Sequence, residues 1–120
     1  MTNAQELHAW PSAWSDLLGQ TITVTGTALD AKSGAMLAGD GPEIWIDGLD
    51  AWPRGYYLGG DRGRRVRVTG TVIQRHDLPV FIPQEGELPR AGMPMPPGTD
   101  LREASRRFLL KDATWELLND

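Results

Sequence analysis

A nine-residue pattern occurs twice in this 120-residue chain, 44 positions apart. The first copy spans residues 19–27 and the second spans residues 63–71, and both follow Gly-x-x-(Ile/Val)-x-Val-x-Gly-Thr. Apolar residues alternate with polar ones in each copy, which is the period of a half-buried β-strand. A glycine interrupts the inward series, as expected where a strand bends or bulges. The repeat therefore predicts two strongly curved strands of a small β-barrel.

Three further segments have strand patterns, and they complete a set of five strands. Short apolar runs bounded by glycine, proline and aspartate are typical of such strands. The predicted strands span residues 21–29, 35–38, 43–47, 64–74 and 108–117. The spacing of Phe108, Trp115 and Leu118 also allows a helix in the last segment. We favour the strand, because the barrel otherwise lacks its fifth member.

Ala-Trp-Pro precedes each copy of the repeat, at 9–11 and 51–53, and a short helix is predicted at both places. The first helix, near 11–18 in an N-terminal helical segment 1–18, rests on five apolar residues at helical spacing. These residues are Leu7, Trp10, Trp14, Leu17 and Leu18. A briefer helical turn is expected within 50–58. These helices would close the barrel ends with aromatic side chains.

The segment between the fourth and fifth predicted strands is rich in proline and glycine. Residues 78–83 could form a short extended edge, but their prolines exclude a central strand. Residues 84–100 contain four prolines and three glycines and are predicted to be a surface loop. A helical turn is expected over 101–107. We expect residues 1–120 to form a single domain.

The predicted fold class is all-β with one or two short helices, and its architecture is a five-stranded OB-fold-like Greek-key barrel. Three motifs, at 19–27, 44–49 and 63–71, resemble those of small stand-alone bacterial OB-type domains. The resemblance covers about residues 14–75, and its motifs are structural. Because one fold hosts many functions, the fold by itself does not decide among them.

Composition excludes several classes of protein. The chain has no cysteine, which removes thiol catalysis, disulfides and thiolate metal sites. Its first residues lack the basic and apolar regions of a signal peptide, and no apolar run approaches the roughly 20 residues of a membrane span. We therefore expect a cytoplasmic protein with no membrane association.

The residues that usually carry catalysis are sparse. His8 is expected on the surface, and the neighbours His76 and Asp77 fit a strand-end turn better than an acid–base pair. Asp40, Asp47 and Asp50 do not have the spacing of an EF-hand loop. We therefore expect a binding protein and not an enzyme, with no metal and no cofactor.

The formal net charge is −4, and residues 1–60 alone carry −5. Ile44 and Ile46 are predicted to point into the barrel, which places their neighbours outside. A tryptophan among carboxylates would then form an acidic, aromatic patch, and tryptophan is a frequent interface anchor. The predicted partner-binding residues are Asp40, Glu43, Trp45, Asp47 and Asp50. The alternative places Trp45 in the core.

The resemblance implies a more specific role, because small bacterial OB-type proteins of this appearance are similar to immunity proteins of toxin–immunity pairs. Such a protein covers the active site of a cognate toxin. A toxin that acts on nucleic acid often has a basic cleft, where Glu43, Asp47 and Asp50 would imitate phosphates. Electrostatic matching of this kind raises association rates.

Single-stranded nucleic acid is the alternative partner. A basic group and aromatic platforms are the usual parts of such a site. The candidate residues are Arg62, Arg64, Arg65, Arg67 and Arg75. They could equally pair with the threonines of the first strand and with acidic neighbours. The negative net charge disfavours this partner, because phosphate contacts supply most non-specific affinity.

Overall fold

The computed structural model describes residues 4–60, 62–88 and 90–118. Strands dominate, with one 3-10 turn and one short helix. The elements are β1 Gln5–Glu6, η1 Trp14–Leu17, β2 Thr21–Ala31, β3 Gly34–Ala38, β4 Ile44–Ile46, β5 Arg65–His76, β6 Val80–Phe81, β7 Met93–Pro94, α1 Leu101–Ala104 and β8 Arg106–Leu117.

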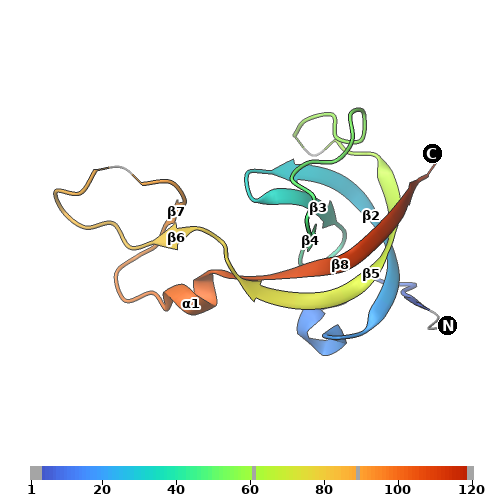
Figure 1. The fold of residues 1–120 in the computed structure, drawn as a ribbon, viewed down its shortest axis with the longest axis horizontal. Helices are drawn as coiled ribbons and strands as arrows, with labels where there is room; N and C mark the ends of the chain where they lie inside the picture. Colours follow the sequence, from blue (N-terminus) through green and yellow to red (C-terminus); the bar gives the residue numbers. More distant parts are fainter. Residues whose placement is uncertain (1–3, 61, 89, 119–120) are drawn as a thin grey trace.

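Five of these strands close into a barrel (Figure 1). The order is β2–β3–β4–β8–β5, and β5 pairs back onto β2. Neighbours in the barrel are antiparallel except β4 and β8, which are parallel. This closed all-β barrel is compatible with an OB-like fold, and it confirms the predicted fold class. The segment 108–117 is a strand, as we favoured.

The two copies of the repeat lie side by side as β2 and β5. Their register runs from Thr21 opposite Thr71 to Thr27 opposite Arg65. The alternating apolar residues of both strands face inward and are buried: Ile22, Val24, Ala28, Val66, Val68 and Val72. On the outer face, threonine hydroxyls form cross-strand hydrogen bonds of 2.8 and 2.7 Å, which stabilise the pairing.

The second glycine of each copy, Gly26 or Gly70, lies where a neighbouring strand of the barrel comes very close. A Cβ on Gly26 would lie 2.7 Å from the carbonyl oxygen of Ala38, and a Cβ on Gly70 would lie 2.9 Å from the Cβ of Leu110. Opposite Gly70, β8 bulges, and Asp112 adopts a left-handed backbone with φ of 54°. Glycine is therefore needed for close approach at both positions.

Tryptophans fill the two ends of the barrel. At one end the Trp10 ring lies against Gly26, Gly39 and Gly41, and it meets Trp14 edge-on at 5.4 Å between centroids. Both indoles donate to the carbonyl oxygen of Pro42, at 2.9 and 2.7 Å. This shared acceptor fixes the N-terminal segment to the turn between β3 and β4.

At the other end, Trp52 is buried under the loop that joins β4 to β5. Its indole donates to the carbonyl oxygen of Met36 at 2.8 Å. The ring stacks on Tyr56 and meets Trp115 edge-on. The two Trp-Pro dipeptides are therefore packing elements, as their position before each repeat indicated.

Of the three predicted helical segments, the one over 101–107 is present in part as α1, the one near 11–18 is shorter than predicted, and the one within 50–58 was wrong. The helix near 11–18 is reduced to the 3-10 turn η1, because Trp10 and Trp14 contact the barrel through Pro42 and not along one helical face. Residues 50–58, all of them described, form turns with no helix. A hydrogen bond from the Trp52 amide to the Asp30 carboxylate, at 2.8 Å, anchors that loop instead.

The segment 77–105, here called the arm, leaves the barrel between β5 and β8 (Figure 1). Within it β6 pairs in parallel with β7, so the predicted edge at 78–83 pairs with part of the predicted loop 84–100. Asp100 caps α1 by accepting from the amides of Arg102 and Glu103. The molecule is 52 Å long, and the arm accounts for its elongation.

We expect Gly26→Val to lower the free energy of unfolding by about 3 kcal/mol, because the new side chain would overlap Ala38 and Leu37. Thr27→Val is the matched control, because Thr27 is next in the strand and faces outward; its change should stay within about 0.5 kcal/mol. Urea denaturation measures both. Equal midpoints for the two variants would contradict the role of Gly26.

Candidate partner-binding surface

The outer face of β4 contains the tryptophan predicted to contact a partner. Ile44 and Ile46 are buried, so Trp45 points away from the core. Trp45 is nevertheless half-buried, because neighbouring side chains cover its ring. Its indole donates to the hydroxyl of Ser33 at 3.0 Å, and the Arg107 guanidinium lies 5.5 Å from the ring centroid. Such a cation–π contact holds the ring in a fixed orientation.

Arg107 connects three parts of the molecule. Its Nε and Nη2 donate to the two oxygens of Asp77, at 2.6 and 2.9 Å, and its Nη1 donates to the carbonyl oxygen of Ser33 at 2.8 Å. The first residue of the arm is thereby joined to the β2–β3 turn. The Arg107 side chain is only 14% exposed. No local pattern in the sequence marks Arg107 as a site residue, since its partners lie 30 and 74 positions away.

Asp47 and Arg75 form an ion pair with each other. Asp47 belongs to the predicted acidic set and Arg75 to the alternative basic set, so one member of each set neutralises the other. The hydrogen bond to Asp47 raises the pKa of the Arg75 guanidinium, which stays charged. Neither side chain offers an isolated charge to a partner.

The other predicted acidic residues are exposed but do not gather at one point. Asp40 and Glu43 lie in the turn between β3 and β4, next to the Trp10 end of the barrel. Asp50 follows Leu49, whose carbonyl oxygen accepts from the amide of Ala35 near the opposite end of β3. The structure therefore places carboxylates along the edge of the β3–β4 face, with the covered Trp45 between them.

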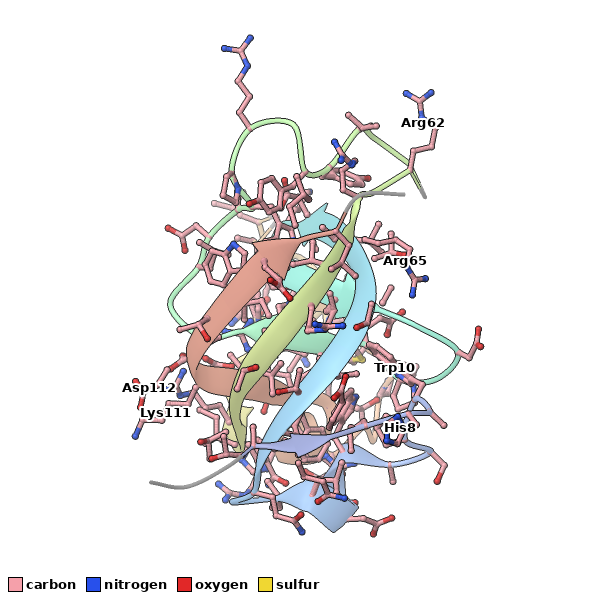
Figure 2. The ribbon with its side chains drawn as sticks, turned by 90° about the vertical axis from the view of Figure 1, so that its right-hand side faces the viewer. His8, Trp10, Arg62, Arg65, Lys111 and Asp112 are labelled. Atoms are coloured by element: carbon pink, nitrogen blue, oxygen red, sulfur yellow. The ribbon has the colours of Figure 1, made fainter. Side chains whose placement is uncertain are left out.

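The candidate arginines are also dispersed. Arg62 and Arg65 are exposed and project from one side of the barrel, where Figure 2 shows them. Arg67 forms an ion pair with Glu116 at 3.0 Å, and Arg64 is half-buried. Arg65 and Arg67 lie opposite Thr27 and Thr25, as one of our two interpretations expected.

The arm exposes large apolar side chains. Leu88 is 85% exposed and Met93 is 61% exposed, the two highest values among the large exposed hydrophobic residues in the described part of the chain. Leu101 at the start of α1 is exposed as well. None of the core cluster residues comes from the arm. The arm holds its shape through local contacts instead, such as Arg90 over the Phe81 ring.

The arm carries carboxylates as well as apolar side chains. Segment 77–105 contains five acidic and two basic residues, and Asp77, Glu87 and Glu103 form ion pairs with Arg107, Arg90 and Arg106. Glu85 and Glu87 are exposed on it, close in sequence to Leu88. Exposed apolar side chains and exposed carboxylates therefore occur together on the arm.

The residues considered for catalysis and metal binding lie apart. His8 is exposed beside Trp10, while Asp77 is bound by Arg107 and not by His76. Within residues 4–60, 62–88 and 90–118, no three carboxylate or imidazole side chains lie close enough to hold a metal ion. In the same residues, no helix is long and apolar enough to cross a membrane.

No protein-family model, no curated protein and no solved structure shows significant similarity to this chain.

The Asp77–Arg107 pair should be visible in the pH dependence of stability. Hydrogen bonds from Arg107 lower the pKa of Asp77, so the pair stabilises the fold above the unfolded pKa of about 3.9. The stabilisation is lost as the pH falls through the lowered folded value. Asp77→Asn should therefore cost at most about 1 kcal/mol at pH 7, because Asp77 is 43% exposed and solvent screens the pair.

The measurement is urea denaturation of the wild type and Asp77→Asn between pH 2 and 7. The two stability curves should converge as the pH falls through the lowered folded-state pKa of Asp77, where its carboxylate becomes protonated. Asp50→Asn removes an exposed carboxylate outside this network and should shift the curve little. A constant offset across the whole pH range would contradict a stabilising ion pair.

Proposed function

We propose that this protein is a non-catalytic binding module that recognises another protein through its arm and the adjoining β3–β4 face. The observation that carries the proposal is the arm itself. Most connections within a compact domain are short, and a long one that leaves the domain is a candidate binding element. The arm exposes the apolar side chains of Leu88 and Met93 outside the barrel core. Their exposure to water is unfavourable in free energy, and burial against a partner would remove this penalty.

The base of the arm is held by several hydrogen bonds of Arg107, which suits recognition. Arg107 joins Asp77 to Ser33 and covers Trp45, so the arm and the β3–β4 face meet at one fixed network. A preorganised surface loses less conformational entropy on binding than a flexible one. The partner would contact the exposed apolar residues of the arm first and the acidic edge of the barrel beside it.

The charge of this surface favours a basic partner. Exposed carboxylates that form no ion pair in the described part of the chain lie on the arm, at Glu85, and along the β3–β4 face, at Asp40, Glu43 and Asp50. Two of the five arginines considered for nucleic acid are already engaged by carboxylates. Complementary charge steers association and fixes register. A protein with a basic cleft fits better than a nucleic acid.

The specific role we propose is inhibition of a bacterial toxin, as an immunity protein. A toxin that acts on nucleic acid needs a cationic active site, and an acidic arm with apolar residues could enter and cover such a cleft. If a captured partner is toxic, co-expression of this protein should restore growth of cells that produce it. Growth inhibition that persists despite stable capture would reject the inhibitory role but keep the binding role.

The first test removes the apolar contact of the arm. Leu88→Asp combined with Met93→Asp should abolish co-purification of the partner from the native cells, since both side chains are exposed and would be buried by binding. The melting temperature should stay nearly constant, because exposed substitutions cost little. Leu18→Asp combined with Leu58→Asp alters two exposed leucines outside the arm and is the control. Capture that survives in the arm variant would overturn the proposal.

The second test concerns charge. Glu43→Arg combined with Asp50→Arg should slow association with the captured partner by about 10-fold at low salt and leave dissociation nearly unchanged. Both residues are exposed, and neither forms an ion pair in the described part of the chain. Surface plasmon resonance at two salt concentrations measures this effect. Tight binding of a fluorescent single-stranded oligonucleotide at low salt would instead favour the nucleic-acid alternative.

A further inference from the structure

The wall of the barrel has a gap on β2, far from the arm. The pairing of β1 with β2 covers Ile22 and Thr23, and the amide of Leu7 then donates to the carbonyl oxygen of Thr23 at 2.8 Å. The pairing of β3 with β2 begins only at Thr27, opposite Ala38. Between these two neighbours, this edge of β2 has no strand beside it in the described part of the chain.

The backbone of Thr25 points into this gap. The amide of Ala28 donates to the carbonyl oxygen of Arg64, and the amide of Val72 donates to the carbonyl oxygen of Gln20. The N–H and C=O groups of the even-numbered residues of β2 therefore face β5. Hydrogen-bonding groups alternate in direction along an antiparallel strand, so those of Thr25 face the opposite side. Neither β1 nor β3 reaches them. One N–H donor and one C=O acceptor are therefore presented together.

The gap opens into a groove of about 850 Å³, within the usual size range of ligand sites. Its lining includes Leu7, Trp10, Thr25, Leu29, Asp40 and Arg65. Figure 2 shows Trp10 and Arg65 on the same side of β2, at different heights. The Trp10 ring lies against Gly26 and Gly39 and closes the groove toward the interior.

We infer that this groove binds a short extended peptide segment of a partner protein, which adds to β2 at Thr25. A peptide residue supplies a donor and an acceptor at the spacing that an open strand position requires. From Thr23 to Thr27 the gap spans about 13 Å, enough for three or four extended residues. The peptide residue opposite Thr25 exchanges both backbone hydrogen bonds with it.

Two features define the peptide chemistry. Leu7 and Leu29 offer apolar contact, and Arg65 is an exposed cation that no ion pair engages in the described residues. The segment should therefore contain one apolar residue and one acidic residue that faces Arg65, while the Asp40 carboxylate in the same lining disfavours a second acidic residue. The groove is separate from the arm, although Asp40 belongs both to its lining and to the acidic edge of the β3–β4 face, so variants of the arm distinguish the two sites.

The test uses an array of acetylated, amidated pentapeptides in which one apolar and one acidic position are varied. The strongest peptide is then titrated into the ¹⁵N-labelled full chain. We expect the Thr25 amide resonance to shift on binding. N-methylation of the peptide residue opposite Thr25 should weaken binding by about 10-fold, because it removes a hydrogen bond without altering the protein.

Arg65→Glu should weaken binding of the acidic peptide by about 10-fold and favour a lysine-containing one. Arg62→Glu is the matched control, because Arg62 is exposed but does not line the groove. The arm variant with Leu88→Asp and Met93→Asp should bind the peptide normally, which separates this site from the proposed function.

Three outcomes would overturn the inference. One is that no array peptide shifts the Thr25 amide at about 1 mM, the weak end of specific binding. Another is binding that neither peptide N-methylation nor Arg65→Glu affects. The third is that another occupant fills the groove. This would be shown if uridine monophosphate, used as a mononucleotide probe, shifts the groove resonances while the peptides do not, or if the chain self-associates through the groove.

Discussion

The rest of the structure depends on the pairing of β2 with β5, because this contact closes the barrel. Inside, the buried valines and isoleucine of the two strands share one core, while the outer threonine hydroxyls bond across the pair. Gly26 and Gly70 let the wall come within contact distance of Ala38 and Leu110. A wall that curves this tightly needs positions without side chains. The arm and the β3–β4 face have defined positions only because this closure holds the strands that carry them.

The strands were predictable because their information is local. Alternation in the repeat identified β2 and β5, and β8 followed from the need for a fifth strand. The N-terminal helix was wrong because helical spacing of Trp10 and Trp14 also suits two rings that donate to one carbonyl at Pro42. That acceptor lies 32 and 28 positions away. A periodicity argument cannot see a partner at such separation, so tertiary packing overrode the local pattern.

The candidate sites were less predictable for a related reason. The sequence concentrates arginines in its second half, and the fold engages several of them with carboxylates from either half. Arg75 lies on Asp47, and Arg107 joins Asp77 to the turn at Ser33. A formal charge counted along the chain therefore overstates the free charge on each face. The arm was predictable in part as a proline-rich loop. The exposure of its leucine and methionine was not predictable, because it depends on which residues form the barrel core.

Closure also explains where binding elements can be placed. Most backbone groups of the ring strands pair with a neighbouring strand, and a change in the inward-facing wall residues disturbs the core. Changes in sequence disturb the barrel least where the chain is not paired within the ring of strands. One such place is the connection between β5 and β8, which leaves the barrel as the arm. The other is the stretch of β2 between its two partial neighbours, where Thr25 keeps an open donor and acceptor. Both proposed surfaces thus lie where the barrel can present new chemistry without reopening the contact that closes it.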